Sequence, residues 1–132
     1  MSLMARIHMI LGALFSLLSV ALGAFGAHVL RQRLEPSDMA IFQTAVHYQG
    51  YHGLALLVVG AWFYYAKSPK QLSWAGSWFT AGIVVFSGSL YLLVAIGARW
   101  FGAITPIGGV CFLLGWISVM AGALRLPASP SS

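Results

Sequence analysis

Charged side chains are scarce in this sequence. Asp, Glu, Lys and Arg make up 7% of the 132 residues, whereas a soluble domain carries about 25%, so an ordinary water-soluble surface is excluded. The few charges leave four charge-free segments of 24 to 28 residues, at positions 7–30, 39–66, 71–98 and 100–124. Each is longer than the roughly 20 residues that a helix needs to cross the hydrocarbon core of a bilayer. The sequence therefore predicts four transmembrane helices.

Acidic residues, cysteine and catalytic motifs are scarcer still. Glu35 and Asp38 are the only acidic residues, and Cys111 is the only cysteine. A metal site usually needs carboxylate or thiolate ligands, or three imidazoles together, so we predict none; an intramolecular disulfide is excluded. The chain has no glycine-rich phosphate loop, no HExxH and no Ser-His-Asp order. Its seven Lys and Arg residues are scattered at the ends of the apolar segments, which excludes a basic surface for nucleic acid.

The connections between the apolar segments are short, which favours antiparallel neighbours. We predict an all-α fold, a four-transmembrane-helix antiparallel bundle, built as a single domain over residues 1–126 with helices at about 7–30, 38–66, 72–98 and 103–124. The Pro/Ser-rich end, 127–132, is expected to be a disordered tail. The first apolar segment resembles a signal peptide, but it is longer than the roughly 7–15 residues typical of one. We expect it to be retained as a helix.

Positive charge is divided almost evenly between the two ends of the predicted bundle. The side of the termini carries Arg6, Lys67, Lys70 and Arg125, and the other side carries Arg31, Arg33 and Arg99. Cytoplasmic loops carry an excess of Lys and Arg. The small difference predicts that both termini are cytoplasmic.

Small residues recur at heptad spacing in two of the predicted helices. The candidate packing residues are Gly12, Ser16, Ser19, Gly23 and Gly26 in the first helix, and Gly108, Cys111, Gly115, Ser118 and Gly122 in the fourth. Membrane helices associate through close backbone approach, because lipid supplies no hydrophobic drive between them. We expect both helices to pack tightly along these lines, inside one chain or between protomers.

Polar side chains gather in one stretch of the second helix, QTAVHYQGYHG at 43–53. The apolar part that follows, 54–66, is too short to span a bilayer, so the helix must continue back through the polar stretch. That places the stretch at the outer interface or just below it. At about 100° per residue, the polar side chains share one half of the helix, apart from Gln49, which is expected to bond to an adjacent helix or protomer.

Two further polar residues arrive at the same end by topology, because His28 closes the first helix and Arg99 begins the last connection. The candidate binding site is His28, Gln43, Tyr48, His52 and Arg99. Arg99 suits an anionic head group or the end of a helix. Three interpretations stay open: interhelical hydrogen bonding, a site for a lipid head group, quinone or other small ligand, and a catalytic or metal site that includes bis-histidine haem.

Four blocks of sequence resemble one known family. GAFGAH (23–28), FQTAVHYQGYH (42–52), FSGSLY (86–91) and TPIGG with the following GW (105–109, 115–116) are similar to the family called domain of unknown function 423. The resemblance implies four membrane helices, a retained first helix and a bacterial inner-membrane location. The family pattern Q-T-x-x-x-Y-Q-x-x-H matches Gln43, Thr44, Tyr48, Gln49 and His52, leaving His47 at an unspecified position, and Arg99 also fits. It implies no activity, substrate or cofactor.

These observations favour a non-catalytic binding or scaffold module. We expect a polar pocket at the outer interface for a lipid head group or another small lipophilic ligand, with no cofactor identified. The alternatives are a His-dependent membrane enzyme and an accessory subunit of a membrane transport or respiratory assembly. The expected partners are membrane lipid and either a second copy or another membrane protein, and not nucleic acid.

Overall fold

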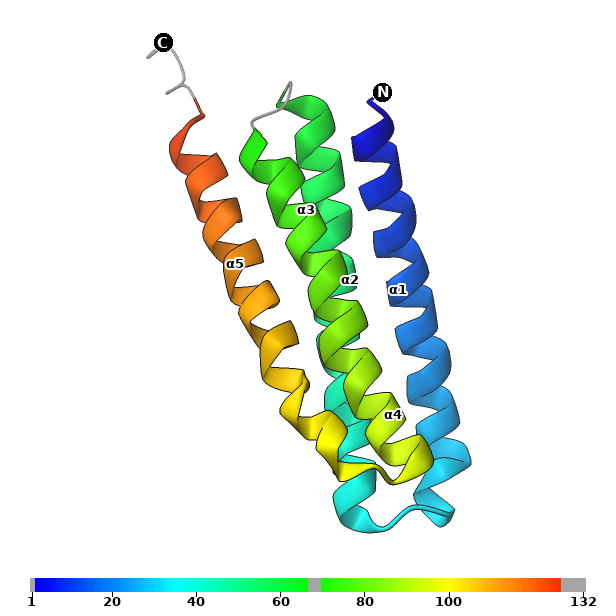
Figure 1. Cartoon of the computed structure of the whole chain (residues 1–132). Helices are drawn as coiled ribbons and strands as arrows, with labels where there is room; N and C mark the ends of the chain where they lie inside the picture. Colours follow the sequence, from blue (N-terminus) through cyan, green and yellow to red (C-terminus); the bar gives the residue numbers. More distant parts are fainter. Residues whose placement is uncertain (1, 67–69, 127–132) are drawn as a thin grey trace.

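Four helical rods lie side by side and alternate in direction in the computed structural model, which describes residues 2–66 and 70–126 (Figure 1). The first rod is α1 (Leu3–His28), followed by the short 3₁₀ helix η1 (Leu30–Gln32), and the second is α2 (Pro36–Tyr65). The third rod joins α3 (Lys70–Gly82), the π-helical η2 (Ile83–Ser87) and α4 (Gly88–Ile96). The 3₁₀ helix η3 (Arg99–Ala103) leads into α5 (Thr105–Leu124). The predicted all-α four-helix bundle is confirmed; the tail at 127–132 lies outside the described residues.

Local sequence signals set several helix ends. The Ser2 hydroxyl accepts a hydrogen bond from the Ala5 backbone N–H and caps α1. Proline stands in the first turn of both α2 and α5, where its missing N–H costs nothing. Gly97 ends α4 with φ of 68°, a left-handed conformation that glycine adopts without strain.

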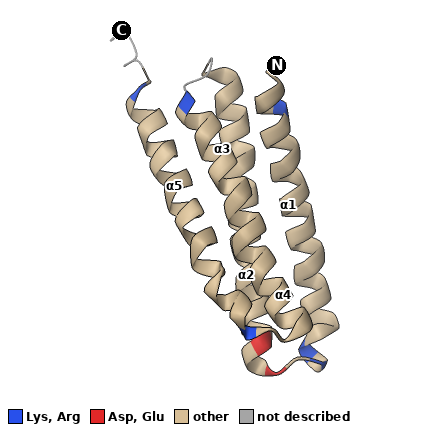
Figure 2. Ribbon diagram, in the orientation of Figure 1, with Lys and Arg blue, Asp and Glu red and all other residues tan. Residues whose placement is uncertain are grey.

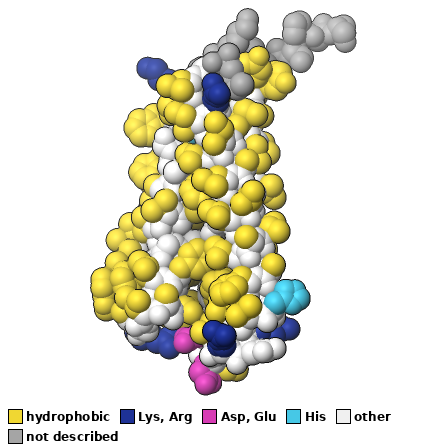
Figure 3. All heavy atoms as spheres, turned by 90° about the vertical axis from the view of Figure 1, so that its right-hand side faces the viewer, with side chains coloured by type: hydrophobic (Ala, Val, Ile, Leu, Met, Phe, Trp, Pro, Cys, Tyr) yellow, Lys and Arg dark blue, Asp and Glu magenta, His cyan; other side chains and the backbone are white. Residues whose placement is uncertain are grey.

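The sides of the bundle suit a bilayer. Three stretches are long and apolar enough to cross a membrane by length and composition: Leu3–Gln32, Lys70–Ile96 and Arg99–Leu124. Helix α2 has 30 residues, which is long enough, although its polar stretch lowers its hydropathy. Charged residues lie at the two ends of the rods (Figure 2), and hydrophobic side chains cover the middle of the face in Figure 3. Since α2 lies alongside the other rods, all four cross the membrane together.

The two lines of small residues pack against different helices. Along α1, a Cβ atom at Gly12 would lie 2.6 Å from the Leu57 backbone nitrogen of α2, and one at Gly26 would lie 2.7 Å from the Phe42 ring. Along α5, a Cβ atom at Gly108 would lie 2.7 Å from the Phe86 Cα atom of the third rod. Helices α1 and α5 themselves lie on opposite sides of the bundle (Figure 1). Each line therefore joins its helix to an inner rod, α1 to α2 and α5 to the third rod.

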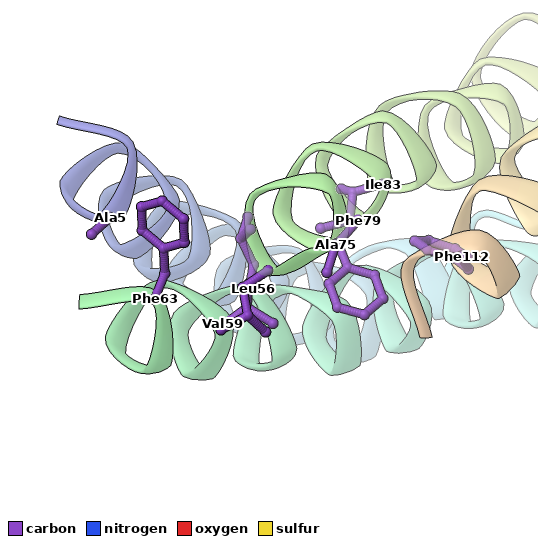
Figure 4. Packing of buried hydrophobic residues seen from close by; sticks show 9 residues of the cluster. Ala5, Leu56, Val59, Phe63, Ala75, Phe79, Ile83 and Phe112 are labelled. Atoms are coloured by element: carbon purple, nitrogen blue, oxygen red, sulfur yellow. The ribbon is translucent and has the colours of Figure 1, made fainter. Parts of the chain in front are cut away.

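Two clusters of buried hydrophobic side chains fill the interior. The larger joins all four rods and includes Leu56, Phe79 and Phe112 (Figure 4). The smaller consists of Met39, Phe42 and Val46, in the first half of α2. Because the smaller cluster lies beside η1, it forms part of the wall of a cavity at that end of the bundle.

Candidate functional site

The polar stretch of α2 runs from near the charged end of the bundle toward the middle of the helix. The end of the bundle is marked by the ion pair between Arg99 and Asp38, at 2.9 Å. His52 follows Asp38 by 14 residues, which is about 21 Å at 1.5 Å per residue. That distance is roughly half the 40–45 Å thickness of a bilayer with its head groups. Gln43 therefore lies nearest the charged end of the bundle, and Tyr48 and His52 lie further toward the middle of α2.

Both ring nitrogens of His52 are engaged. Its Nδ1 lies 2.8 Å from the Tyr48 carbonyl oxygen, which can only accept, so Nδ1 carries the proton. The Trp116 indole N–H, which can only donate, then gives its hydrogen bond to Nε2 at 3.1 Å. The ring also stacks on Phe112, with centroids 3.6 Å apart. This arrangement holds a neutral imidazole and leaves neither nitrogen with a free lone pair for a metal, a haem or a substrate proton.

Tyr48 and His52 line a groove between α2, η2 and α5. The groove has a volume of about 500 Å³ and its other lining residues are Phe86, Pro106, Gly109, Val110, Phe112, Leu113 and Trp116. The Tyr48 ring stacks on Phe86 with centroids 4.6 Å apart. Trp116, Val110 and Leu113 are largely exposed on the groove. The surface is therefore aromatic and faces the acyl chains of the surrounding lipid.

Gln49 is buried and joins three helices. Its side-chain amide N–H donates to the Phe15 carbonyl oxygen of α1 at 3.0 Å, and its carbonyl oxygen accepts from the Tyr91 hydroxyl of α4 at 2.7 Å. The prediction that this side chain bonds to an adjacent helix is confirmed. Ser19 and Ser87 also donate to backbone carbonyl oxygens of α2. Much of the polarity around α2 therefore holds helices together, because buried polar groups in a membrane protein must find protein partners.

The other three candidate residues lie elsewhere. Arg99 is held by Asp38, although its side chain is 63% exposed. Gln43 lines a separate polar hollow of about 290 Å³, together with Arg31 and Leu34. His28 is the exposed last residue of α1. The structure thus brings Tyr48 and His52 together and does not place His28, Gln43 or Arg99 on their groove.

Sequence reasoning missed a larger apolar cavity at the η1 end of the bundle. It has a volume of about 590 Å³ and is lined by Leu22, Phe25, Leu30, Arg33, Leu34, Phe42, Tyr91, Val94 and Ala95. These residues come from α1, the η1 connection, α2 and α4, so no single stretch of sequence signals the cavity. Arg33 is the one charged side chain in its lining.

A second residue missed from sequence is His8 of α1. Its side chain is 2% exposed, and its Nδ1 atom is buried without a hydrogen-bond partner among the described residues. The ring packs directly against Gly76 of α3 and lies edge-on to Phe63, with centroids 6.4 Å apart. Over residues 2–66 and 70–126, no group of three or more His, Cys, Asp or Glu side chains could hold a metal ion. The His8 ring lies at the contact between α1 and α3.

The fold and the grooves define a class: a small, multi-pass, all-helical membrane protein whose polar side chains are largely engaged in helix packing. The chain belongs to the family described as "Protein of unknown function (DUF423)", whose model matches residues 22–109.

Similar proteins extend the match over nearly the whole chain. A UPF0382 membrane protein of Staphylococcus epidermidis is 45% identical over 91% of this chain and 97% of its own length. UPF0382 membrane protein YwdK of Bacillus subtilis is 41% identical over 91% and 98%. UPF0382 inner membrane protein YgdD of Escherichia coli is 38% identical over 92% of each. No solved structure matches. The resemblance predicted from the sequence is confirmed.

Proposed function

We propose that this protein is a non-catalytic membrane module that binds a lipid-like molecule with an anionic head group at the η1 end of the bundle. The observation that carries the proposal is an apolar cavity of about 590 Å³ whose lining includes Arg33. Ligand cavities in proteins typically measure about 300–1,000 Å³ and combine an apolar wall with a few polar groups. An acyl chain would lie against Leu22, Phe42 and Val94, with its head group at the arginine.

The neighbouring polar hollow extends this site. Leu34 lines both spaces, and the hollow adds Arg31 and Gln43. Arg99 is neutralised by Asp38, while the described residues show no ion pair for Arg31 or Arg33. Arg33 lines the cavity and Arg31 lines the adjoining hollow. Two guanidinium groups without an ion pair favour a phosphate, which arginine binds through paired hydrogen bonds. The proposed ligand is still a lipid head group, as predicted from the sequence, and Gln43 is still one of the binding residues. The proposed site no longer includes His52.

The hydrogen bonds of His52 argue against the alternative of a His-dependent enzyme. A general base needs a free nitrogen within reach of a substrate proton, and both His52 nitrogens are engaged by Tyr48 and Trp116. The same bonds argue against His52 as a haem ligand.

A large side chain introduced into the cavity should displace the bound lipid. We expect the protein, purified in mild detergent with phosphatidylglycerol, to retain one lipid in native mass spectrometry. Ala95→Trp places a large ring in the cavity lining and should lower the retained fraction at least tenfold. Ile96→Trp is the matched control, because Ile96 is 65% exposed and outside that lining.

Lipids with different head-group charges distinguish binding in the cavity from a preference for an anionic head group. Arg33→Gln should weaken retention of phosphatidylglycerol and leave retention of phosphatidylethanolamine unchanged, because only the first carries a net negative charge. Equal retention of lipid by wild type and Ala95→Trp would show that the cavity is not the binding site. Equal retention of both lipids by the wild type would rule out an anionic preference.

We also propose that both termini are cytoplasmic, so that this site faces the outer leaflet. Helix α1 begins and α5 ends at one end of the bundle (Figure 1), where Arg6, Lys70 and Arg125 lie; Lys67 lies outside the described residues. The opposite end carries Arg31, Arg33 and Arg99. A fluorescent protein fused to the C-terminus should fluoresce, and alkaline phosphatase fused there should be inactive. An active phosphatase fusion would reverse the assignment.

A further inference from the structure

Helix α2 exposes a regular stripe of side chains along most of its length. The members are Ala40, Thr44, His47, Tyr51, Leu54 and Val58, all exposed on the surface of the protomer. Their spacings of 4, 3, 4, 3 and 4 residues are those of a heptad seam, the pattern along which two helices pack in parallel. We call these six residues the α2 stripe. Phe42, the α2 residue that lines the apolar cavity, lies about 160–240° away from the stripe around the helix at 100° per residue.

The centre of the α2 stripe is polar where the membrane is most apolar. His47 and Tyr51 follow Asp38 by 9 and 13 residues, or about 14 and 20 Å along the helix, which lies within the hydrocarbon core. Their rings stack on each other with centroids 6.1 Å apart. Within residues 2–66 and 70–126, neither side chain makes a hydrogen bond, whereas Thr44 bonds to the Ala40 carbonyl oxygen. Acyl chains cannot satisfy an imidazole or a phenol, so a partner must.

A third unpartnered polar group lies beside the stripe. The Ser16 hydroxyl oxygen of α1 is buried and makes no hydrogen bond within the described part of the chain. It lines a hollow of about 270 Å³ between α1 and α2, together with Ser19, Gly50 and the two aromatic residues of the stripe, His47 and Tyr51. The hollow, next to His47 and Tyr51, is large enough to receive a side chain from a neighbouring helix.

We propose that the α2 stripe is the interface with a second copy of this chain, whose α2 helix packs against it in parallel about a two-fold axis. Two copies inserted in the same orientation place His47 and Tyr51 at the same depth as their counterparts. Imidazole and phenol each offer one donor and one acceptor, so the surface can bond to itself as a two-fold interface requires. Residues 39–66 contain no Asp, Glu, Lys or Arg, so no like charges meet across the axis. A different partner protein would need polar groups at the same depth as His47 and Tyr51. A second copy of this chain has these groups at that depth.

Cysteine cross-linking in native membranes tests the pairing. In a Cys111→Ser background, Leu54→Cys should form a disulfide-linked species of twice the protomer mass under mild oxidation. Val84→Cys is the matched control. Val84 is 59% exposed on η2, and it lies about as many residues before Arg99 as Leu54 lies after Asp38, at the same end of the bundle. This variant should remain a monomer. A monomeric Leu54→Cys protein, an adduct of another mass, or equal cross-linking of Val84→Cys would each overturn the proposal.

Removing the polar centre tests its chemistry without endangering the fold, because both side chains are exposed in the protomer. His47→Phe with Tyr51→Phe should raise the dimer dissociation constant in detergent about tenfold or more, while the melting temperature at concentrations where the protomer is monomeric stays the same. An unchanged dissociation constant would show that these groups do not meet across an interface.

Discussion

Replacing Gly108 by leucine is expected to destabilise the protein more than any other single change along the two lines of small residues. A Cβ atom there would lie 2.7 Å from the Phe86 Cα atom and even closer to the Phe86 backbone nitrogen. Backbone atoms inside a helix cannot step aside as a flexible side chain can. The new side chain must therefore push α5 away from η2, and overpacking of this kind typically costs about 1–3 kcal/mol. The melting temperature in detergent should fall by several degrees.

The neighbouring glycine provides a matched control. A Cβ atom at Gly109 would meet nothing within 4 Å, so Gly109→Leu adds the same side chain to the same turn of α5 without a clash. Both substitutions gain about 1 kcal/mol of helix propensity, which cancels in the comparison. Gly109→Leu should melt at or above the wild-type temperature. If the two variants melted together, α5 would not pack on η2 through Gly108.

Sequence patterns predicted the helices because membrane insertion depends on properties of each segment alone. The four charge-free runs correspond to α1, α2, the third rod and α5, since length and hydropathy decide whether a segment spans. The spacing of small residues also showed which faces of α1 and α5 allow close approach. It could not show what lies opposite, because a glycine line has no recognition chemistry of its own. The choice of α2 as the partner of α1 appears only when Gly12 is seen beside Leu57.

The candidate site was harder to predict, because a sequence shows that polar residues lie at the same end of the bundle and does not show which way their side chains point. Tyr48 and His52, one turn apart on α2, do share a groove. Arg99 was expected in the same place, but Asp38, far away in sequence, pairs with it. His8 was overlooked because a lone histidine in an apolar run forms no pattern, although its ring is buried against Gly76.

The apolar cavity could not be predicted from the sequence either. Its walls are ordinary hydrophobic residues such as Leu22 and Val94, contributed by separate helices. Residues of this type fill lipid-facing surfaces everywhere in the chain. A cavity is the space that remains after helices of fixed shape have packed, so it follows from the crossing of the rods and not from any local motif.

Gln49 and Tyr91 are expected to behave as an energetically coupled pair. Gln49 is 3% exposed and connects α1, α2 and α4 through two hydrogen bonds. Gln49→Leu would leave the Tyr91 hydroxyl without its acceptor in an apolar interior, and an unsatisfied buried group costs about 1–3 kcal/mol. Tyr91→Phe would leave the Gln49 carbonyl oxygen without its donor. Each single variant should therefore melt several degrees below the wild type.

The double variant separates this bond from simple loss of packing. When Gln49→Leu and Tyr91→Phe are combined, neither unsatisfied group remains, so the loss of stability should be smaller than the sum of the two single losses. Coupling energies of interhelical hydrogen bonds in membrane proteins average about 0.6 kcal/mol and reach about 1.7 kcal/mol; a double-mutant cycle measures them. Gln43→Leu is the control, because Gln43 is exposed and its loss should leave stability unchanged. Strictly additive losses would mean that the Tyr91 hydroxyl has another partner, and that Gln49 stabilises the bundle only through its bond to the Phe15 carbonyl oxygen of α1.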